Sequence, residues 1–294
     1  MSKALRILKN LLLGILLLLV LAIVIIYIWS EIKLNRTYDL DIPPFDMAKY
    51  QPNIEEGKRL SYIIGCSGCH DLEMQGQVLW DVPNVLTMVA PNLMDIAKSS
   101  SDSDLEKMIR HGIRKDGTSV IMGMPSEFFR YITDQDLANI IAYIRNKPYV
   151  DPPDQTTSYK LLGRLGIIIG EIKNSRESLA EIEPRVENNS LAKISDDSLT
   201  DQLKMGKYIT QIACTECHGF NLQGNEKGKT PDLMIAYGYS PEDWQKLMTT
   251  GKGLGDRELR LMSKMVKYRF SHFTDEEREA VYLFLRYWAE SRMK

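Results

Sequence analysis

Two short runs in the sequence decide the fold: CSGCH at residues 66–70 and CTECH at residues 214–218. Together they contain all four cysteines of the 294-residue chain. Four cysteines are too few to hold a chain of this length together by disulfide bonds. Their arrangement in the same Cys-x-x-Cys-His pattern instead predicts one chemical site in each half of the chain.

The pattern is typical of covalent haem attachment. A Cys-x-x-Cys-His run at the end of a helix places two thiols where they can add to the two vinyl groups of a haem, and the histidine that follows can bind the iron. We therefore predict two covalently bound haem c groups. The predicted attachment residues are Cys66, Cys69, Cys214 and Cys217, and the predicted iron ligands are His70 and His218.

Three other kinds of site use the same cysteine spacing. A thioredoxin-like dithiol requires a βαβ setting, which this sequence does not indicate. A zinc site would have to pool both runs, and the repeat would then be unexplained. A disulfide within each run would not account for the histidines. Haem attachment accounts for the cysteines and the histidines together.

The regions around the two runs are copies of one another, with the same landmarks in the same order. In the first copy the landmarks are Gly57, Gln75, Gly76, Pro91, Met124, Phe129, Thr133 and Arg145, and in the second they are Gly206, Gln223, Gly224, Pro231, Met265, Phe270, Thr274 and Arg286. The first copy has about eight additional residues between its histidine and its proline. An internal repeat of this kind predicts two domains of the same fold.

Both copies are predicted to be helical. Thr133 with Asp136, and Thr274 with Glu277, are N-cap signals before helices with apolar stripes. Ser240, followed by a proline, is a third such signal. Neither copy contains a convincing run of alternating strand residues, so the predicted fold class is all-α.

The N-terminal residues 11–29 carry no charge. A helix of that length covers about 28 Å, close to the roughly 30 Å hydrocarbon core of a bilayer. Lys3, Arg6 and Lys9 precede the run, and Tyr27 and Trp29 lie at its far end. Basic residues stay in the cytoplasm, so we expect one transmembrane helix with the rest of the chain outside. A cleaved signal peptide is the alternative, although the apolar run is longer than usual and no small-x-small site follows it.

We expect five segments along the chain. They are a membrane anchor at 1–30 with its helix at about 7–29, a tether at 31–49, a first domain at 50–148, a linker at 149–199 and a second domain at 200–294. The linker contains an apolar island at 161–172 that is too short and too broken by glycine to span a membrane. We expect this island to pack across the two domains, and a second contact at the membrane interface is the alternative.

The sixth ligand of each iron is predicted to be a methionine. Electron carriers commonly fill this position with a thioether, which raises the reduction potential. Met124 and Met265 lie at equivalent positions of the two copies, whereas most methionines are core residues. The competing candidates are Met122 and Met262, neither of which has a partner in the other copy.

Two further histidines need an interpretation. His111 precedes Gly112 at a predicted helix end, where a cation is favoured by the helix dipole. Ligation of the first haem by two histidines, with His111 as the second, is the alternative. His272 aligns with Tyr131 in the first copy, and we interpret it as a solvated or packing residue.

The net charge of -2, from Lys+Arg 37 and Asp+Glu 39, excludes non-specific electrostatic binding of nucleic acid by the whole molecule. The segment 252–269 is nevertheless locally basic. Its cations are Lys252, Arg257, Arg260, Lys264, Lys267 and Arg269, against Asp256 and Glu258. We interpret this segment either as a patch that steers an acidic redox partner or as an ordinary solvated face.

Residues 57–153 resemble the c-type cytochrome domains in cytochrome subunits of membrane-bound bacterial dehydrogenases, and residues 200–294 resemble them more loosely. The likeness rests on CSGCH at 66–70, IRHG at 109–112, Asp-Gly at 116–117, Met-Pro at 124–125 and the helix from 133 to 145. It implies two tandem class I cytochrome c domains with His/Met iron, behind one N-terminal transmembrane helix. It also implies that the carbonyls of Pro91 and Pro231 hold the second ring nitrogen of each histidine. Val266 replaces the proline that follows the first methionine, which puts Met265 in doubt.

The expected function follows from filled iron coordination. A haem with both axial positions occupied does not bind substrate without losing a ligand, so the default expectation is one-electron transfer, by an electron carrier or an electron-transfer subunit of an oxidoreductase complex. The donor would be a quinol-oxidising complex or dehydrogenase of a bacterial respiratory chain, and the acceptor an oxidase, reductase or soluble carrier. The haem domains would lie on the periplasmic side of the inner membrane. The alternatives are a dihaem enzyme that oxidises thiosulfate or reduces peroxide, and a haem c subunit of a haem-copper oxidase.

Overall fold

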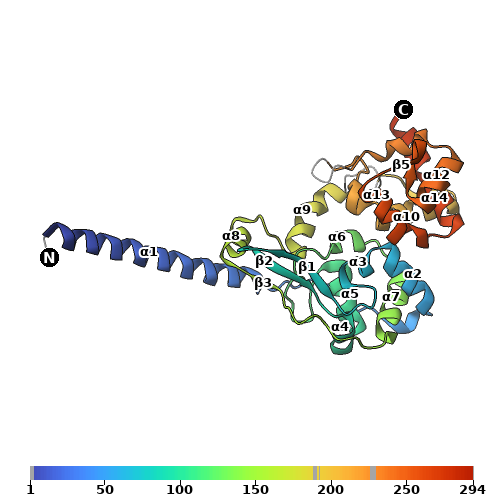
Figure 1. Ribbon diagram of the computed structural model, residues 1–294. Coiled ribbons are helices and arrows are strands. Elements are labelled where there is room, and N and C mark those ends of the chain that lie inside the picture. Colours follow the sequence, from blue (N-terminus) through green and yellow to red (C-terminus); the bar gives the residue numbers. More distant parts are fainter. Residues whose placement is uncertain (1–2, 188–190, 192, 226–229, 294) are drawn as a thin grey trace.

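The computed structural model describes residues 3–187, 191, 193–225 and 230–293. It consists of one long helix that projects from a body of two helical lobes (Figure 1). We refer to residues 47–146 as the first lobe and to residues 196–293 as the second lobe. The predicted all-α class is confirmed, with only short strands beside the helices.

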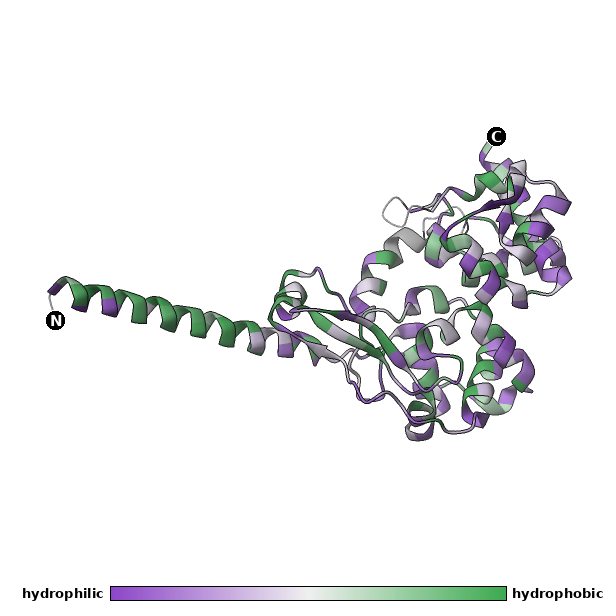
Figure 2. Ribbon diagram, in the orientation of Figure 1, coloured by the Kyte–Doolittle hydropathy of each residue, from purple (hydrophilic) through white to green (hydrophobic). Residues whose placement is uncertain are grey.

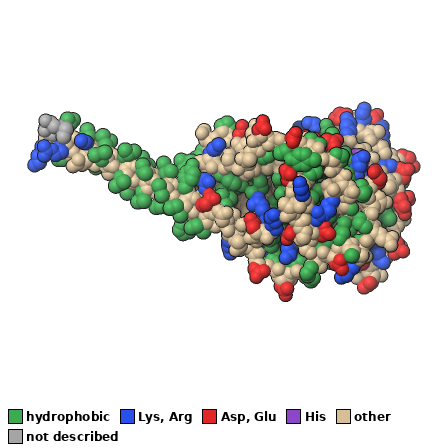
Figure 3. Space-filling view, turned by 90° about the horizontal axis from the view of Figure 1, so that it is seen from below, with side chains coloured by type: hydrophobic (Ala, Val, Ile, Leu, Met, Phe, Trp, Pro, Cys, Tyr) green, Lys and Arg blue, Asp and Glu red, His purple; other side chains and the backbone are tan. Residues whose placement is uncertain are grey.

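The projecting helix is α1 (Lys3–Leu34), whose 32 residues extend beyond both ends of the predicted 7–29. It is apolar along most of its length and exposed almost throughout (Figure 2). The space-filling view shows a rod of apolar side chains with lysine and arginine at its N-terminal tip (Figure 3). Length and composition are sufficient for α1 to cross a membrane.

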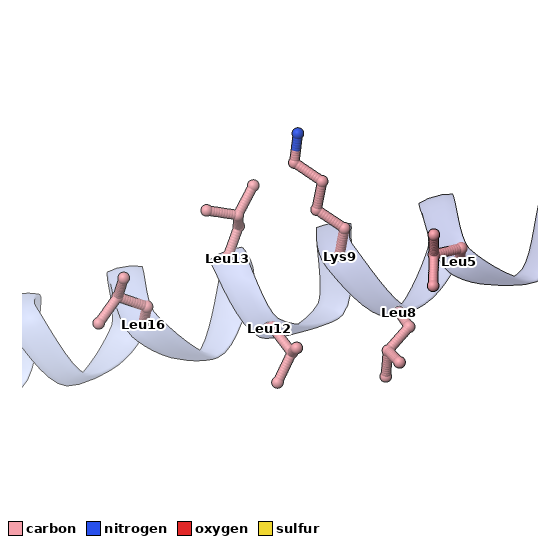
Figure 4. A pocket seen from close by; sticks show the side chains of 6 residues that line it. All are labelled: Leu5, Leu8, Lys9, Leu12, Leu13 and Leu16. Carbon is pink, nitrogen blue, oxygen red and sulfur yellow. The ribbon is translucent and has the colours of Figure 1, made fainter. Parts of the chain in front are cut away.

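A shallow apolar crease on the surface of α1 is formed mainly by leucines on neighbouring turns. Figure 4 shows this crease and its residues Leu5, Leu8, Lys9, Leu12, Leu13 and Leu16. A single exposed helix supplies every side chain, so the crease is a feature of the helix surface and not an enclosed ligand site.

The first lobe is built from helices that begin at side-chain caps. Asn53 caps α2 by accepting from the amide of Glu56, and Ser101 forms a reciprocal capping box with Asp104. The predicted cap at Thr133 is confirmed, because its hydroxyl accepts from the amide of Asp136. The helices are η1 (Met47–Lys49), α2 (Ile54–Ile63), α3 (Cys66–His70), α4 (Leu93–Ser99), α5 (Asp102–His111), α6 (Ser126–Phe129) and α7 (Asp134–Asn146).

The second lobe repeats this order. The predicted caps at Ser240 and Thr274 are confirmed, since their hydroxyls accept from the amides of Asp243 and Glu277. Its elements are η2 (Asp196–Ser198), α10 (Asp201–Ala213), α11 (Thr215–His218), η3 (Leu233–Gly238), α12 (Pro241–Thr250), β4 (Lys252–Gly253), η4 (Leu254–Asp256), β5 (Arg257–Glu258), α13 (Leu261–Tyr268), η5 (Phe270–His272) and α14 (Asp275–Met293).

A glycine lies at the helix crossing in each lobe. A Cβ on Gly57 in α2 would lie 1.9 Å from the carbonyl oxygen of Asn139 in α7. A Cβ on Gly206 in α10 would lie 2.0 Å from the carbonyl oxygen of Ala280 in α14. The first and last helices of each lobe therefore cross in backbone contact, and any side chain larger than hydrogen would push them apart. This explains why both copies of the repeat begin with glycine.

The additional residues of the first copy form a β-hairpin, where the sequence had indicated no strands. β1 (Gln77–Val82) pairs antiparallel with β2 (Leu86–Ala90), and β2 pairs with β3 (Ser158–Tyr159). Asn84 supplies the positive φ of the turn. The alternation is obscured in the sequence because β2 is buried along most of its length.

The described part of the linker contains two helices, and the expectation for its apolar island was wrong. α8 (Leu161–Ile169) packs against the C-terminal end of α1 and not across the two lobes. α9 (Ser175–Glu187) packs on α5 and α6 instead. The physical reason is that Arg164 and Lys33 provide polar ties between α8 and α1 that an apolar pattern does not reveal.

Polar and aromatic contacts join the two lobes. The Arg59 guanidinium donates to both carboxylate oxygens of Glu277, at 2.7 and 2.6 Å, and to the carbonyl of His272 at 3.0 Å. The Tyr208 hydroxyl donates to a carboxylate oxygen of Asp136 at 2.5 Å. Such bidentate and charge-assisted bonds fix orientation as well as distance, so the lobes have a defined mutual position.

Candidate functional site

Each cysteine run forms a short helix at the end of the first long helix of its lobe. Gly65 precedes Cys66 with φ of 89°, a conformation that glycine adopts without strain and that lets the chain turn from α2 into α3. In the second lobe Cys214 joins α10 directly to α11. The four cysteines are free of disulfide bonds and partly exposed.

Burial raises the pKa of the Cys66 and Cys214 thiols to about 12, and it also raises the pKa of Cys69 and Cys217. A dithiol redox centre needs a lowered thiol pKa, so these runs lack the environment of a thioredoxin-like pair. Among residues 3–187, 191, 193–225 and 230–293, no cluster of three or more His, Cys, Asp or Glu side chains could hold a metal ion. The part of the chain described thus offers no pooled zinc site.

The two histidines are held in the same way. Nδ1 of His70 lies 2.8 Å from the carbonyl oxygen of Pro91, and Nδ1 of His218 lies 2.9 Å from that of Pro231. A carbonyl oxygen can only accept, so Nδ1 carries the proton and Nε2 keeps its lone pair. Burial also lowers the pKa of both imidazoles, against the opposing effect of the proline carbonyls. Each histidine therefore presents a neutral ring in one tautomer, as an iron ligand requires.

The loop after each histidine has the same path. The amide of Gly76 donates to the carbonyl of His70, and the amide of Gly224 donates to that of His218, both at 2.9 Å. Both glycines have positive φ, and a Cβ on either would lie 2.3 Å from a carbonyl oxygen. The Gln-Gly pair that recurs in the sequence is therefore the turn that returns the chain past the histidine toward its proline.

The four candidate methionines differ in setting. Met122 and Met124 lie in the loop before α6, and Met262 and Met265 lie three residues apart on α13. Met124, Met262 and Met265 are partly buried against the core. Pro125 prevents a continuous helix at Met124, whereas Val266 keeps its amide and allows α13 to run through Met265. The two predicted ligands therefore occupy equivalent sequence positions but different local structures.

The two spare histidines make other contacts. Nε2 of His111 lies 3.0 Å from Oε1 of Glu106. The predicted helix end is confirmed, and Gly112 ends α5 in a left-handed conformation. The ring of His272 stacks on Tyr62 of the other lobe, with the centroids 4.4 Å apart. His272 is therefore a packing residue between the lobes.

Sequence reasoning missed a charged bridge between the two runs. Arg269 had been grouped with the basic surface of 252–269, but only 8% of it is exposed. Its Nε donates to the carbonyl of Ile63 at 2.8 Å, and its Nη1 donates to Glu216, inside the second run, at 2.8 Å. In a separate contact between the lobes, the rings of Phe128 and Phe220 stack with their centroids 4.7 Å apart. Glu216 between two cysteines was the one signal that could have indicated a cationic partner.

These residues fit two haem c groups. Each site offers two unpaired thiols, one buried imidazole with Nε2 available, and a carbonyl that fixes the ring. The donor set is soft sulfur for attachment and imidazole for iron, which matches haem c chemistry. The Nη2 atom of Arg269 is buried and has no hydrogen-bond partner among the described residues, so this site retains one buried donor.

Comparison with known proteins gives the same picture. The family model described as Cytochrome c matches residues 54–147 and 203–288. The chain is also similar to the fructose dehydrogenase cytochrome subunit of Gluconobacter japonicus, with 24% identity over 273 residues. The alignment covers 83% of this chain and 54% of that relative, so the chain spans about half of the relative's length.

Proposed function

Because the chain belongs to the cytochrome c family, we propose that it is a membrane-anchored cytochrome that relays electrons from a membrane-bound dehydrogenase. It carries two covalently bound haem c groups, and its function is electron transfer. The attachment residues are Cys66 with Cys69, and Cys214 with Cys217. When bound, each haem supplies a one-electron iron couple.

The observation that carries the proposal is the pair of equivalent histidine sites. His70 and His218 would bind the two irons through Nε2, because Nδ1 is occupied by Pro91 and Pro231. Burial of both rings excludes water from this side of each site. Met124 and Met265 would close the opposite side. Two closed sites favour electron transfer over substrate binding, which would need an open position.

The position of the chain in the cell rests on α1. A helix of this length and hydropathy, with basic residues before it, would span the inner membrane with its N-terminus in the cytoplasm. Both lobes would then lie in the periplasm, where haem is attached to the cysteines and where redox partners can dock. The similarity to a dehydrogenase cytochrome subunit supports a dehydrogenase as donor, and an oxidase, reductase or soluble carrier would accept the electrons.

Expression of the full chain in a bacterium that matures c-type cytochromes tests the proposal. We expect membrane-bound protein whose mass exceeds that of the polypeptide by two haem groups, with two one-electron steps in a redox titration. We also expect the reduced protein not to bind carbon monoxide rapidly. A mass equal to the polypeptide alone would refute the haem sites. Rapid carbon monoxide binding at one haem would favour a dihaem enzyme instead.

A further inference from the structure

We propose that α8 is an interfacial helix, lying in the headgroup region of the same membrane that α1 spans. The chain would then be held at the membrane by two elements, and the lobes would have a fixed orientation to its surface. This inference rests on the proposed anchoring by α1. It is carried by the contacts of α8 with α1, by the exposure of its apolar side chains and by its place along the anchor.

Polar bonds fix α8 to the end of α1. Nζ of Lys33 donates to the carbonyls of Ile167 and Ile168 at 3.0 and 3.1 Å. Lys33 thereby adds a donor to two carbonyls in the last turn of α8, of which that of Ile167 also accepts from the amide of Gly170. Nη1 of Arg164 donates to Ser30 at 2.8 Å and to Glu31 at 2.9 Å.

The Arg164 guanidinium also lies over the ring of Tyr27, 4.5 Å from its centroid. Its charge is therefore paired on the α1 side of α8 and does not interrupt the outer face. An isolated arginine in the middle of an apolar helix would oppose membrane contact, but this one is turned toward α1.

The opposite side of α8 is closed by the hairpin. A Cβ on Gly163 would lie 2.1 Å from the carbonyl oxygen of Val85, so the helix backbone touches the hairpin turn directly. Ile167 is buried. With α1 and the hairpin covering these two sides, α8 has little freedom to rotate or to move away from the anchor.

The remaining face of α8 is apolar and exposed. Leu161, Leu162, Leu165 and Ile169 are exposed there. Four exposed large aliphatic residues on a nine-residue helix are unusual for a face in water. At the end of α1 that α8 contacts, Ile28, Trp29 and Ile32 are exposed as well.

The place of α8 along α1 sets its depth. Its contacts reach α1 at Tyr27, Ser30, Glu31 and Lys33, at the end of the apolar run and next to the aromatic residues that favour the membrane interface. A nine-residue helix spans about 14 Å and cannot cross a bilayer. Lying along the surface with its apolar face inserted is the arrangement such helices adopt. Because α8 is bound to the end of the apolar anchor, lipid, and not a protein partner, is the proposed occupant.

Three cysteine variants of matched exposure test the inference. In the haem-loaded protein the native cysteines are consumed by thioether bonds, so an introduced cysteine is the reactive thiol. The variants are Leu162→Cys on α8, Leu16→Cys within α1 and Ile235→Cys in the second lobe, at native exposures of 55%, 56% and 53%. Each full-length holoprotein is reconstituted in phosphatidylcholine vesicles and treated with a charged, membrane-impermeant maleimide. Labelling is followed by mass, and the reduced visible spectrum confirms folding.

We expect Ile235→Cys to be labelled. Leu16→Cys and Leu162→Cys should react at about one tenth of that rate or below it, because lipid covers both positions. Equal rates for Leu162→Cys and Ile235→Cys, with Leu16→Cys protected, would overturn the inference and leave the anchor intact. Rapid labelling of Leu16→Cys would overturn the anchor itself and, with it, the inference. Protection of Leu162→Cys that disappears when the protein is diluted in lipid would mean that a second copy covers α8, and would also overturn it.

Discussion

Arg269 and Glu216 form an ion pair between the two cysteine runs, with Nη1 2.8 Å from Oε2. The same guanidinium holds the carbonyl of Ile63, near the start of the first run, at 2.8 Å. Its charge reaches both sites, because it opposes the burial-driven rise in pKa of all four cysteine thiols. One buried side chain therefore links the lobes and places a positive charge near both haem sites.

Replacing Arg269 with glutamine should lower the reduction potentials of both haems. A nearby cation stabilises the reduced, less positive state, and a charge about 10 Å away at an effective dielectric constant of about 20 contributes roughly 1–2 kcal/mol. Partial cancellation by Glu216 leaves a shift of about 20–60 mV, since 1.4 kcal/mol corresponds to about 59 mV for one electron. Spectroelectrochemical titration of the two haems measures this shift.

Lys267→Gln is the matched control, because it removes one cation from an exposed position in the last turn of α13, two residues before Arg269. We expect its potentials to stay within about 10 mV of the native values, as solvent screens an exposed charge. Equal effects of the two substitutions would show that the buried position of Arg269 has no special influence. Glu216→Gln should shift the potentials in the opposite direction.

Much of each site could be predicted because it depends on local sequence. The cysteine runs, the histidines that follow them and the Gln-Gly turn recur at matching positions, and the helix caps follow from single side chains. The bonds from His70 to Pro91 and from His218 to Pro231 are also present as the family resemblance implied.

The parts that could not be predicted depend on contacts between distant segments. Arg269 belongs by sequence to a basic surface, and only the packing of the lobes buries it against Ile63 and Glu216. In the sequence, the segment that forms α8 is a short apolar stretch, and nothing in it indicates that it packs against α1. Its place beside α1 is set by Lys33 and Arg164, which in the sequence are unremarkable charges.

His272 should make the contact between the lobes sensitive to pH. Burial, followed by the nearby cations Arg59 and Lys58, lowers its pKa below the usual value of about 6.5. Between the folded-state pKa and 6.5 the unfolded state binds more protons, so the free energy of unfolding falls as pH decreases through that window. The effect should be less than about 1 kcal/mol, because the ring is only partly buried and solvent screens its charge.

His272→Tyr is the appropriate variant, since Tyr131 occupies the matching position of the first copy. Thermal unfolding of both holoproteins from pH 7.5 to pH 5 provides the measurement, and the other histidines cancel in the difference. We expect the native protein to lose more stability than the variant as pH is lowered through 6.5. Parallel curves would mean that protonation of His272 has no effect on the packing against Tyr62.

Leucine substitutions should identify the sixth iron ligands. Met124→Leu and Met265→Leu should each open one iron, so that the reduced variant binds one carbon monoxide per protein. Met122→Leu and Met262→Leu are the matched controls and should bind none. Loss of the thioether should also lower the potential of the affected haem, because soft sulfur stabilises the reduced iron.

The assignment in the second lobe has a competitor on the same helix. Met262 and Met265 lie three residues apart on α13 and so share a helix face. Carbon monoxide binding by Met262→Leu in place of Met265→Leu would transfer the assignment by one turn of α13. Binding by neither variant would point to a ligand outside α13. In the first lobe no methionine one helical turn away competes with Met124, since Met124 lies in the loop before Pro125 and not on a helix.

The exposed cations near α13 should steer an acidic partner. Arg269 does not belong to this set, because it is buried. They are Lys252, Arg257, Arg260, Lys264 and Lys267, with Asp256 partly neutralised by Lys246. Charged small-molecule oxidants test this surface without knowledge of the natural partner. Ferricyanide, an anion, should oxidise the reduced protein more slowly as salt rises from about 0.01 M to about 0.5 M, because the Debye length shrinks from about 30 Å to a few ångströms.

Charge reversal by Lys264→Glu should slow ferricyanide oxidation several-fold at low salt and flatten its salt dependence, because attraction at the docking face is lost. Lys115→Glu is the matched control, with the same charge change at an exposed position of the first lobe. A cationic oxidant such as hexaammineruthenium(III) should respond in the opposite sense to Lys264→Glu. If both variants slow ferricyanide equally, only the net charge of the protein matters, and the cations near α13 are an ordinary solvated face.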